Sequence, residues 1–216
     1  MAKHERARNS SDLRRRGPRR EPFPRALIVC EGSKTEVNYF EEIRQESRLS
    51  SVDVKVIHSP LGTGPQQVVE GAEAEFNKTK AFEKIYAVFD RDQHLTYANA
   101  IAMANARNGK FKNDERKAVS FEPVVSVPCF ELWLLLHFVN QMAPIHRHDA
   151  LAQVQQHLLG YAKGNEGMFA ATIEYLEVAT QRAVALKAQN GRLPGTESYT
   201  DVHELVEELR KLALRR

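Results

Sequence analysis

The chain has 216 residues, of which 42% are hydrophobic and 27% charged, and its formal net charge is +3. This is the composition of an ordinary folded protein, long enough for one sizeable core or for a core with a small helical lobe. No apolar run approaches the ~18 residues that span a bilayer, and no apolar stretch follows the basic N-terminus as in a secretory signal. We therefore expect a cytoplasmic protein without a membrane partner.

The two cysteines do not form the pattern of a disulfide framework or a zinc site. Cys30 and Cys129 each lie inside an apolar run, without a CxxC pair or an accompanying Cys/His pair. The sequence therefore predicts two buried, reduced thiols.

The basic residues are concentrated at the N-terminus. Residues 1–25 carry nine basic and three acidic side chains, a net charge of +6, so the remainder of the chain is net −3. Residues 1–24 lack apolar periodicity and contain three prolines, which predicts a disordered tail. Such a tail can follow the phosphates of a nucleic acid through Arg14, Arg15, Arg16, Arg19 and Arg20. A solvated terminus without a partner is the alternative.

From residue 25 onward, short apolar runs alternate with segments of helical spacing. We predict strands at 25–30, 52–57 (nearer an edge) and 84–89, and one or two more in 118–127, interrupted at Pro123. Helices are expected from Ser33 or Thr35 to about 48, then at 65–80, 94–107 and 130–139. The chain after 148 is predicted to be all helical, with segments near 149–159, 168–189 and 201–214.

This alternation predicts βαβ units, and hence an α/β fold with a mainly parallel sheet flanked by helices and a C-terminal helical segment. We expect three regions: a basic disordered tail (1–24), an α/β core (25–140) and a helical C-terminal subdomain (141–216).

Acidic side chains follow two of the predicted strands. Glu31 comes directly after the run that ends at Cys30, and Asp90 and Asp92 come directly after the run that ends at Phe89. Ligands of open parallel sheets bind at the carboxyl ends of the strands, so both acidic groups would emerge at one edge. Carboxylates gathered there repel one another unless a cation neutralises them, and their hard oxygens suit Mg²⁺ or Mn²⁺. Either feature alone is common by chance.

Three separated blocks resemble the RloB family: LIVCEGSKTEVNYF (27–40), YAVFDRDQH (86–94) and PCFELWLLLHF (128–138). The terminal TDVHELVEEL (200–209) is similar to the last helix of that family, whose members are often encoded beside bacterial restriction-modification loci. RloB proteins in turn resemble Toprim domains, the metal-binding modules of topoisomerases, DnaG-type primases and OLD-type nucleases. The resemblance implies a Toprim-like sheet with Glu31, Asp90 and Asp92 as metal ligands, and Glu36 where OLD-like relatives often carry a second acid.

Several further residues have two interpretations each. The N–H groups of Lys34 and Thr35 at a helix N-terminus could hold a phosphate, with Lys34 offsetting transition-state charge; ordinary capping is the alternative. His94 could contact a phosphate or support the metal, or be merely solvated. Glu131, among apolar neighbours, needs a partner, which could be a second metal or an arginine.

Other groups favour a structural role. A salt bridge is expected for Arg91, and Trp133 is expected in the core. The cluster His146, His148 and Asp149 has the composition of a metal site, but without a partner of fixed spacing surface histidines are the better interpretation.

The sequence therefore favours a metal-dependent phosphodiesterase, a nuclease acting on DNA or RNA with Mg²⁺ or Mn²⁺ as cofactor. In that mechanism Glu31, Asp90 and Asp92 hold the metal, while Glu36 or Glu131 helps to hold a second metal or acts as a base. The family resemblance implies a role in bacterial defence, with restriction-modification or other defence proteins as partners. Two alternatives remain: a non-catalytic nucleic-acid- or partner-binding accessory protein, and an enzyme that acts on a nucleotide. The oligomeric state is left open.

Overall fold

The computed structural model describes residues 24–190 and 198–214. These residues form an α/β fold around one sheet. The elements in chain order are β1 (Ala26–Cys30), α1 (Thr35–Glu46), β2 (Val54–His58), α2 (Pro65–Thr79), β3 (Lys84–Asp90), α3 (Tyr97–Arg107), β4 (Ser120–Val127), α4 (Glu131–Leu136), α5 (Arg147–His157), α6 (Met168–Thr172), the 3-10 turn η2 (Ile173–Tyr175), α7 (Leu176–Asn190), β5 (Tyr199–Thr200) and α8 (Val202–Leu214).

The sheet has the strand order β2-β1-β3-β4-β5. The first four strands are parallel, and β5 pairs antiparallel with Ser126 and Val127 of β4. All five residues of β1 are buried, as expected for a strand covered on both faces, whereas the edge strand β2 buries only Val54 and Val56. The predicted fold class is confirmed.

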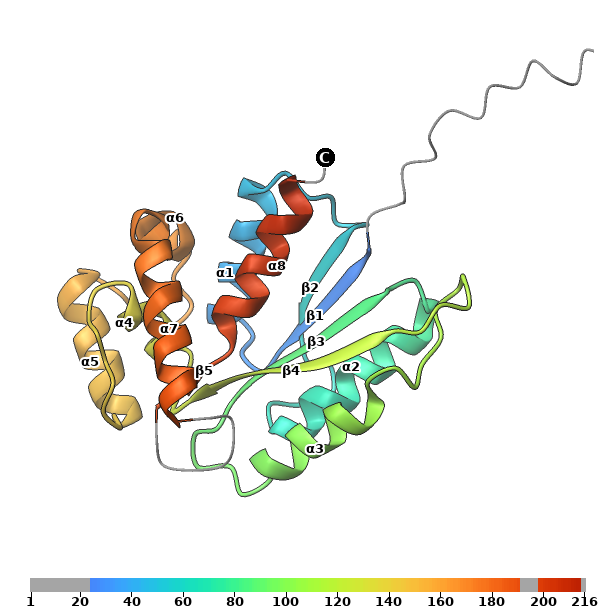
Figure 1. Cartoon of the computed structure of the whole chain (residues 1–216), viewed down its shortest axis with the longest axis horizontal. Helices are drawn as coiled ribbons and strands as arrows, with labels where there is room; N and C mark the ends of the chain where they lie inside the picture. The colour runs from blue at the N-terminus through green and yellow to red at the C-terminus, as the bar shows by residue number, and fades with distance from the viewer. Residues whose placement is uncertain (1–23, 191–197, 215–216) are drawn as a thin grey trace, which may run out of the picture.

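Helices cover both faces of the sheet (Figure 1). Because neighbouring side chains of a strand point to opposite faces, β1 contributes Leu27 and Val29 to the core under α2 and α3. Its residues Ile28 and Cys30 join the core formed with α1, α4, α7 and α8. Helices α4 to α7 group beside α1 and α8, and α5 and α7 place Val154 and other apolar side chains in this same core.

Two details differ from the sequence prediction. First, 120–127 is one continuous strand, although Pro123 has no N–H to donate. Among the described residues, only β3 pairs with β4 along its first six positions, so Pro123 sits where the sheet is paired on one side. Second, the chain after 148 is not all helical, because Tyr199 and Thr200 form the short strand β5.

The helix boundaries also shift by a few residues. α3 begins at Tyr97 rather than at residue 94, and α4 ends at Leu136 rather than at 139. Cys30 and Cys129 are buried free thiols, as predicted. Within the described ranges, no helix has the length and apolar character needed to cross a bilayer.

Trp133 is fully buried against α1, and its polar atom has a partner. Its indole Nε1 donates to the hydroxyl of Tyr39 over 2.9 Å, and both rings are at most 1% exposed. A buried donor that loses its acceptor costs more than a bond between exposed groups, because water cannot replace the lost partner.

Replacing Tyr39 by Phe therefore removes the acceptor of a buried N–H. We expect Tyr39→Phe to lower the free energy of unfolding by about 1–3 kcal/mol. Tyr175→Phe, which removes a hydroxyl from a 45%-exposed side chain, serves as the control. Urea denaturation monitored by circular dichroism measures both, and equal stability of the two variants would contradict this role of Tyr39.

His137, at the end of α4, is buried beside the carbonyl of Trp133, which lies 2.9 Å from His137 Nδ1. Burial lowers the pKa of His137 from 6.5 to about 4, so the imidazole is neutral in the folded protein near neutral pH. The unfolded chain binds a proton at this residue around pH 6.5 and the folded chain does not.

Proton uptake by His137 in the unfolded chain therefore lowers the free energy of unfolding as the pH falls from 6.5 toward 4. Above pH 6.5 this residue is neutral in both states, and the loss does not occur. We expect wild type to lose about 1–3 kcal/mol more stability than His137→Asn when the pH is lowered from 7.5 to 4.5. Urea denaturation at both pH values measures the loss of stability of each protein. The carboxylates are the same in both proteins, so their contributions cancel when the two losses are compared. Parallel losses for the two proteins would show that His137 is not the buried neutral group described here.

Candidate metal centre

Two neighbouring parallel strands bring the first acidic groups together. Glu31 follows the last residue of β1, and Asp90 ends β3; these strands are paired, with Cys30 opposite Val88. The N–H of Glu31 donates to the carbonyl of Val88 over 2.8 Å, which extends the pairing past the end of β1. In return, the N–H of Asp90 donates to Oε2 of Glu31 over 2.9 Å. The sheet itself thus orients the Glu31 carboxylate.

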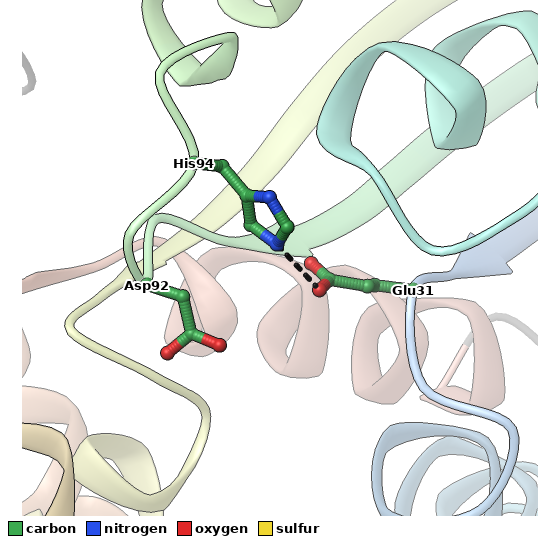
Figure 2. Close-up of side chains that lie close together, drawn as sticks. All are labelled: Glu31, Asp92 and His94. Atoms are coloured by element: carbon green, nitrogen blue, oxygen red, sulfur yellow. Dashed lines mark ion pairs between the residues drawn. The ribbon is translucent and has the colours of Figure 1, made fainter.

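Glu31, Asp92 and His94 form the outer part of the centre (Figure 2). One ligand atom from each of the three lies within 4.8 Å of the others. The Nε2 atom of His94 is 3.5 Å from Oε1 of Glu31. The backbone at Asp92 is left-handed (φ +42°), a conformation that Asp tolerates better than most residues, and its N–H donates to the carbonyl of Pro128 over 3.0 Å. This turn directs the Asp92 side chain back toward the end of β1.

Glu36, Asp90 and Glu131 form the inner part. They are only 8%, 9% and 1% exposed. Asp90 Oδ2 accepts from the N–H of Phe130 over 3.1 Å, at the start of α4 where Glu131 follows. A Cβ at Gly32 would lie 2.0 Å from Oε2 of Glu36, so a glycine is required for this carboxylate to fold back over the chain.

Burial dominates the electrostatics of these acids. Loss of solvation, and secondarily the Asp92 charge, raises the pKa of Glu31 to about 7. Loss of solvation also raises the pKa of Glu36 to about 7, with a further contribution from Glu131. The pKa of Asp90 is raised well above its usual value by burial and then by the neighbouring carboxylates. The centre therefore needs protons or a cation to offset its negative charge.

The donor atoms fit a hard divalent cation. Among the described residues, three buried carboxylate oxygens at the centre have no hydrogen-bond partner: Oε2 of Glu36, Oδ1 of Asp92 and Oε2 of Glu131. Buried polar atoms without a partner are rare in folded proteins, and such oxygens can serve as ligands of divalent cations. A set of carboxylate oxygens with one imidazole matches Mg²⁺ or, with the nitrogen, Mn²⁺.

Two basic side chains of the C-terminal segment border the carboxylates. Lys163 Nζ lies 3.2 Å from Oε1 of Glu131, which also accepts from the hydroxyl of Tyr161 over 3.3 Å. Arg147 donates to Oδ2 of Asp92 over 2.7 Å. Neither Lys163, Tyr161 nor Arg147 was predicted from the sequence, because they lie more than 50 residues after the DxD pair. The glycines around residue 160 indicated only turns.

Lys34 and Thr35, the predicted phosphate-binding pair, differ in their contacts. Lys34 is exposed at the start of α1, and beside it the Thr35 hydroxyl accepts the N–H of Gly164 over 2.9 Å. Both line a hollow of about 310 Å³ with Glu31, Asp92 and Lys163. Thr35 thus anchors the loop that carries Lys163, a role that the sequence did not indicate.

The remaining predicted residues form no hydrogen bond or ion pair with these acids within the described part of the chain, or lie outside it. His146 and His148 are exposed and stand 5.1 Å apart between ring centres, as expected for surface histidines. The salt bridge expected for Arg91 is absent among the described residues. The arginines of the predicted nucleic-acid-binding tail, Arg14 to Arg20, lie outside the described residues, so their role stays a prediction.

The chain was also compared with known proteins. No curated protein and no solved structure matches it. A family model described as RloB-like protein matches residues 26–209, which is most of the chain and includes every residue of the acidic centre. The chain therefore belongs to the RloB-like protein family.

Proposed function

We propose that this protein is a metal-dependent phosphodiesterase that cleaves a nucleic acid. The observation that carries the proposal is the gathering of five carboxylates, three of them with a partnerless buried oxygen, at the carboxyl ends of β1 and β3. A merely structural site would pair such oxygens, because each unpaired one destabilises the fold. The neighbouring Lys163 and Arg147 supply positive charge, as a site for an anionic substrate requires.

Glu31, Asp92 and His94 would hold one Mg²⁺ or Mn²⁺, and Glu36, Asp90 and Glu131 a second ion or the proton of the attacking water. A bound ion of this kind activates water at neutral pH and stabilises charge on a phosphate. Lys163 is 48% exposed beside Glu131, so its ammonium group can also reach a phosphate in the hollow. Lys34, whose side chain lies beside Gly164, would contribute from the same wall as Lys163, and the basic tail would strengthen backbone binding.

The alternative is a non-catalytic accessory protein that binds a nucleic acid or a defence partner. Two ion pairs favour it: Lys163 with Glu131 and Arg147 with Asp92 already neutralise part of the acidic centre without any metal. The family resemblance supports a role in bacterial defence beside a restriction-modification system under either function. Dependence on a divalent ion separates the two.

The first prediction concerns cleavage. Wild type should cut at least one of labelled single-stranded DNA, duplex DNA or tRNA with Mg²⁺ or Mn²⁺ and not with EDTA. Asp92→Asn should reduce the rate about 100-fold or more, because it removes a metal-binding charge. Asp149→Asn, at an exposed acid on the first turn of α5, should cut like wild type. Equal cutting by both variants, or cutting in EDTA, would rule out the proposed centre.

The second prediction concerns metal binding without turnover. Mn²⁺ at 100 times its Kd should stabilise the fold by about 2.7 kcal/mol and raise the Tm by about 5–10 °C. Glu36→Gln removes one repelling buried charge, so at pH 8 in EDTA its Tm should exceed that of wild type. The same variant should gain less from Mn²⁺.

Differential scanning fluorimetry measures both effects, with Glu46→Gln at the exposed end of α1 as the matched control. The idea fails if Mn²⁺ leaves the Tm of wild type unchanged, or if Glu36→Gln behaves like Glu46→Gln in both buffers.

A further inference from the structure

A second hollow, of about 340 Å³, adjoins the acidic centre. Asp92 and Arg147 line both hollows, so the two share a wall. The size is at the small end of the range for ligand pockets. Its apolar lining includes Val127 and Pro128 at the end of β4 and Ile145 before the start of α5.

Basic side chains also line this hollow. Arg91, His146 and Arg147 line it, and Asp92 is the acid that they share with the metal centre. Arg91 is half-buried, yet no carboxylate of the described residues lies within ion-pair distance of it. Arg147 donates through one nitrogen to Asp92. Because a guanidinium has five N–H donors, Arg147 can hold this carboxylate and still donate to a further anion.

An arginine without a carboxylate partner keeps its N–H donors available for an anionic ligand. The neighbouring acidic centre and the apolar lining of the hollow indicate what kind of anion fits. Asp92 and Arg147 also line the acidic centre, which would take one phosphate, and apolar side chains line the basic hollow together with the two arginines. A strand of nucleic acid offers this combination, since each phosphate is followed by an apolar sugar face and a base.

We propose that this basic hollow, formed by Arg91, Arg147, His146 and the apolar wall of Val127, Pro128 and Ile145, binds the nucleotide next to the phosphate held at the acidic centre. Arg91 and Arg147 bind the phosphate of that nucleotide, and its sugar or base packs on the apolar wall. The inference rests on the proposed function, because the acidic centre defines which phosphate is the neighbour. It adds a subsite that positions the strand.

The test measures binding of a fluorescein-labelled 12-nucleotide single strand to the full chain in EDTA. Anisotropy titrations from 50 to 300 mM NaCl give the slope of log Kd against log salt. Each phosphate contact with a single strand contributes about 0.7 to this slope. Arg91→Gln should therefore lower the slope by about 0.7 and weaken binding several-fold at low salt. Arg147→Gln should act in the same direction.

Arg210→Gln is the matched control, because Arg210 is an exposed arginine of α8 that lines neither hollow. It should keep the wild-type slope. Arg91→Gln should also keep the wild-type Tm, since Arg91 makes no ion pair among the described residues. If Arg91→Gln and Arg210→Gln have the same slope, or if wild type does not bind the strand, the proposed subsite is wrong.

The two proposals can fail separately. Binding in EDTA that depends on Arg91, without cleavage in Mg²⁺ or Mn²⁺, would support the subsite and remove the catalytic function. Cleavage that depends on Asp92, with binding indifferent to Arg91, would keep the catalytic function and remove the subsite.

Discussion

The structure depends on one electrostatic constraint: carboxylates are held close together, largely out of water, where two parallel strands end. Burial and mutual repulsion raise the pKa values of Glu31, Glu36 and Asp90. The N–H groups of Asp90 and Phe130 compensate part of this cost, as do the two cations of the helical segment. The partnerless oxygens that remain can serve as ligands of a divalent cation.

The C-terminal helices take part in this centre through one loop. The chain between α5 and α6 lies against the start of α1, where Gly164 donates to Thr35 and accepts from the side chain of Asn38. Gly164 has φ +87°, a conformation that favours glycine, and the turn there places Lys163 beside Glu131. Residues separated by about 130 positions in the sequence therefore form one wall of the hollow.

The sequence predicted most of the α/β fold, because buried parallel strands appear as continuous apolar runs and helices keep their own spacing. The ends of β1 and β3 also follow from those runs, which is why Glu31 and Asp90 were correctly placed near each other. The strand β5 is only two residues long and gives no periodic signal. Pro123 suggested an interruption, because the sequence does not indicate that this part of β4 is paired on one side.

The two basic side chains at the centre, Lys163 and Arg147, could not be predicted from the sequence for a different reason. A lysine in a glycine-rich link and an arginine between two surface histidines have no local feature that distinguishes them from solvated charges. Only the packing of α5 and the following loop against the carboxyl edge gives Lys163 and Arg147 their partners. Side-chain pairing across distant segments is set by tertiary contacts, which short-range patterns do not contain.

Crystals of the full chain soaked in Mn²⁺ and measured near the manganese absorption edge test the central claim most directly. The account predicts an anomalous difference peak between the carboxylates of Glu31 and Asp92, with the Arg147 pair to Asp92 altered. A map without a peak at the carboxyl ends of β1 and β3, at a Mn²⁺ concentration that saturates other divalent-ion enzymes, would contradict a metal centre and leave protons, Lys163 and Arg147 to neutralise the carboxylates.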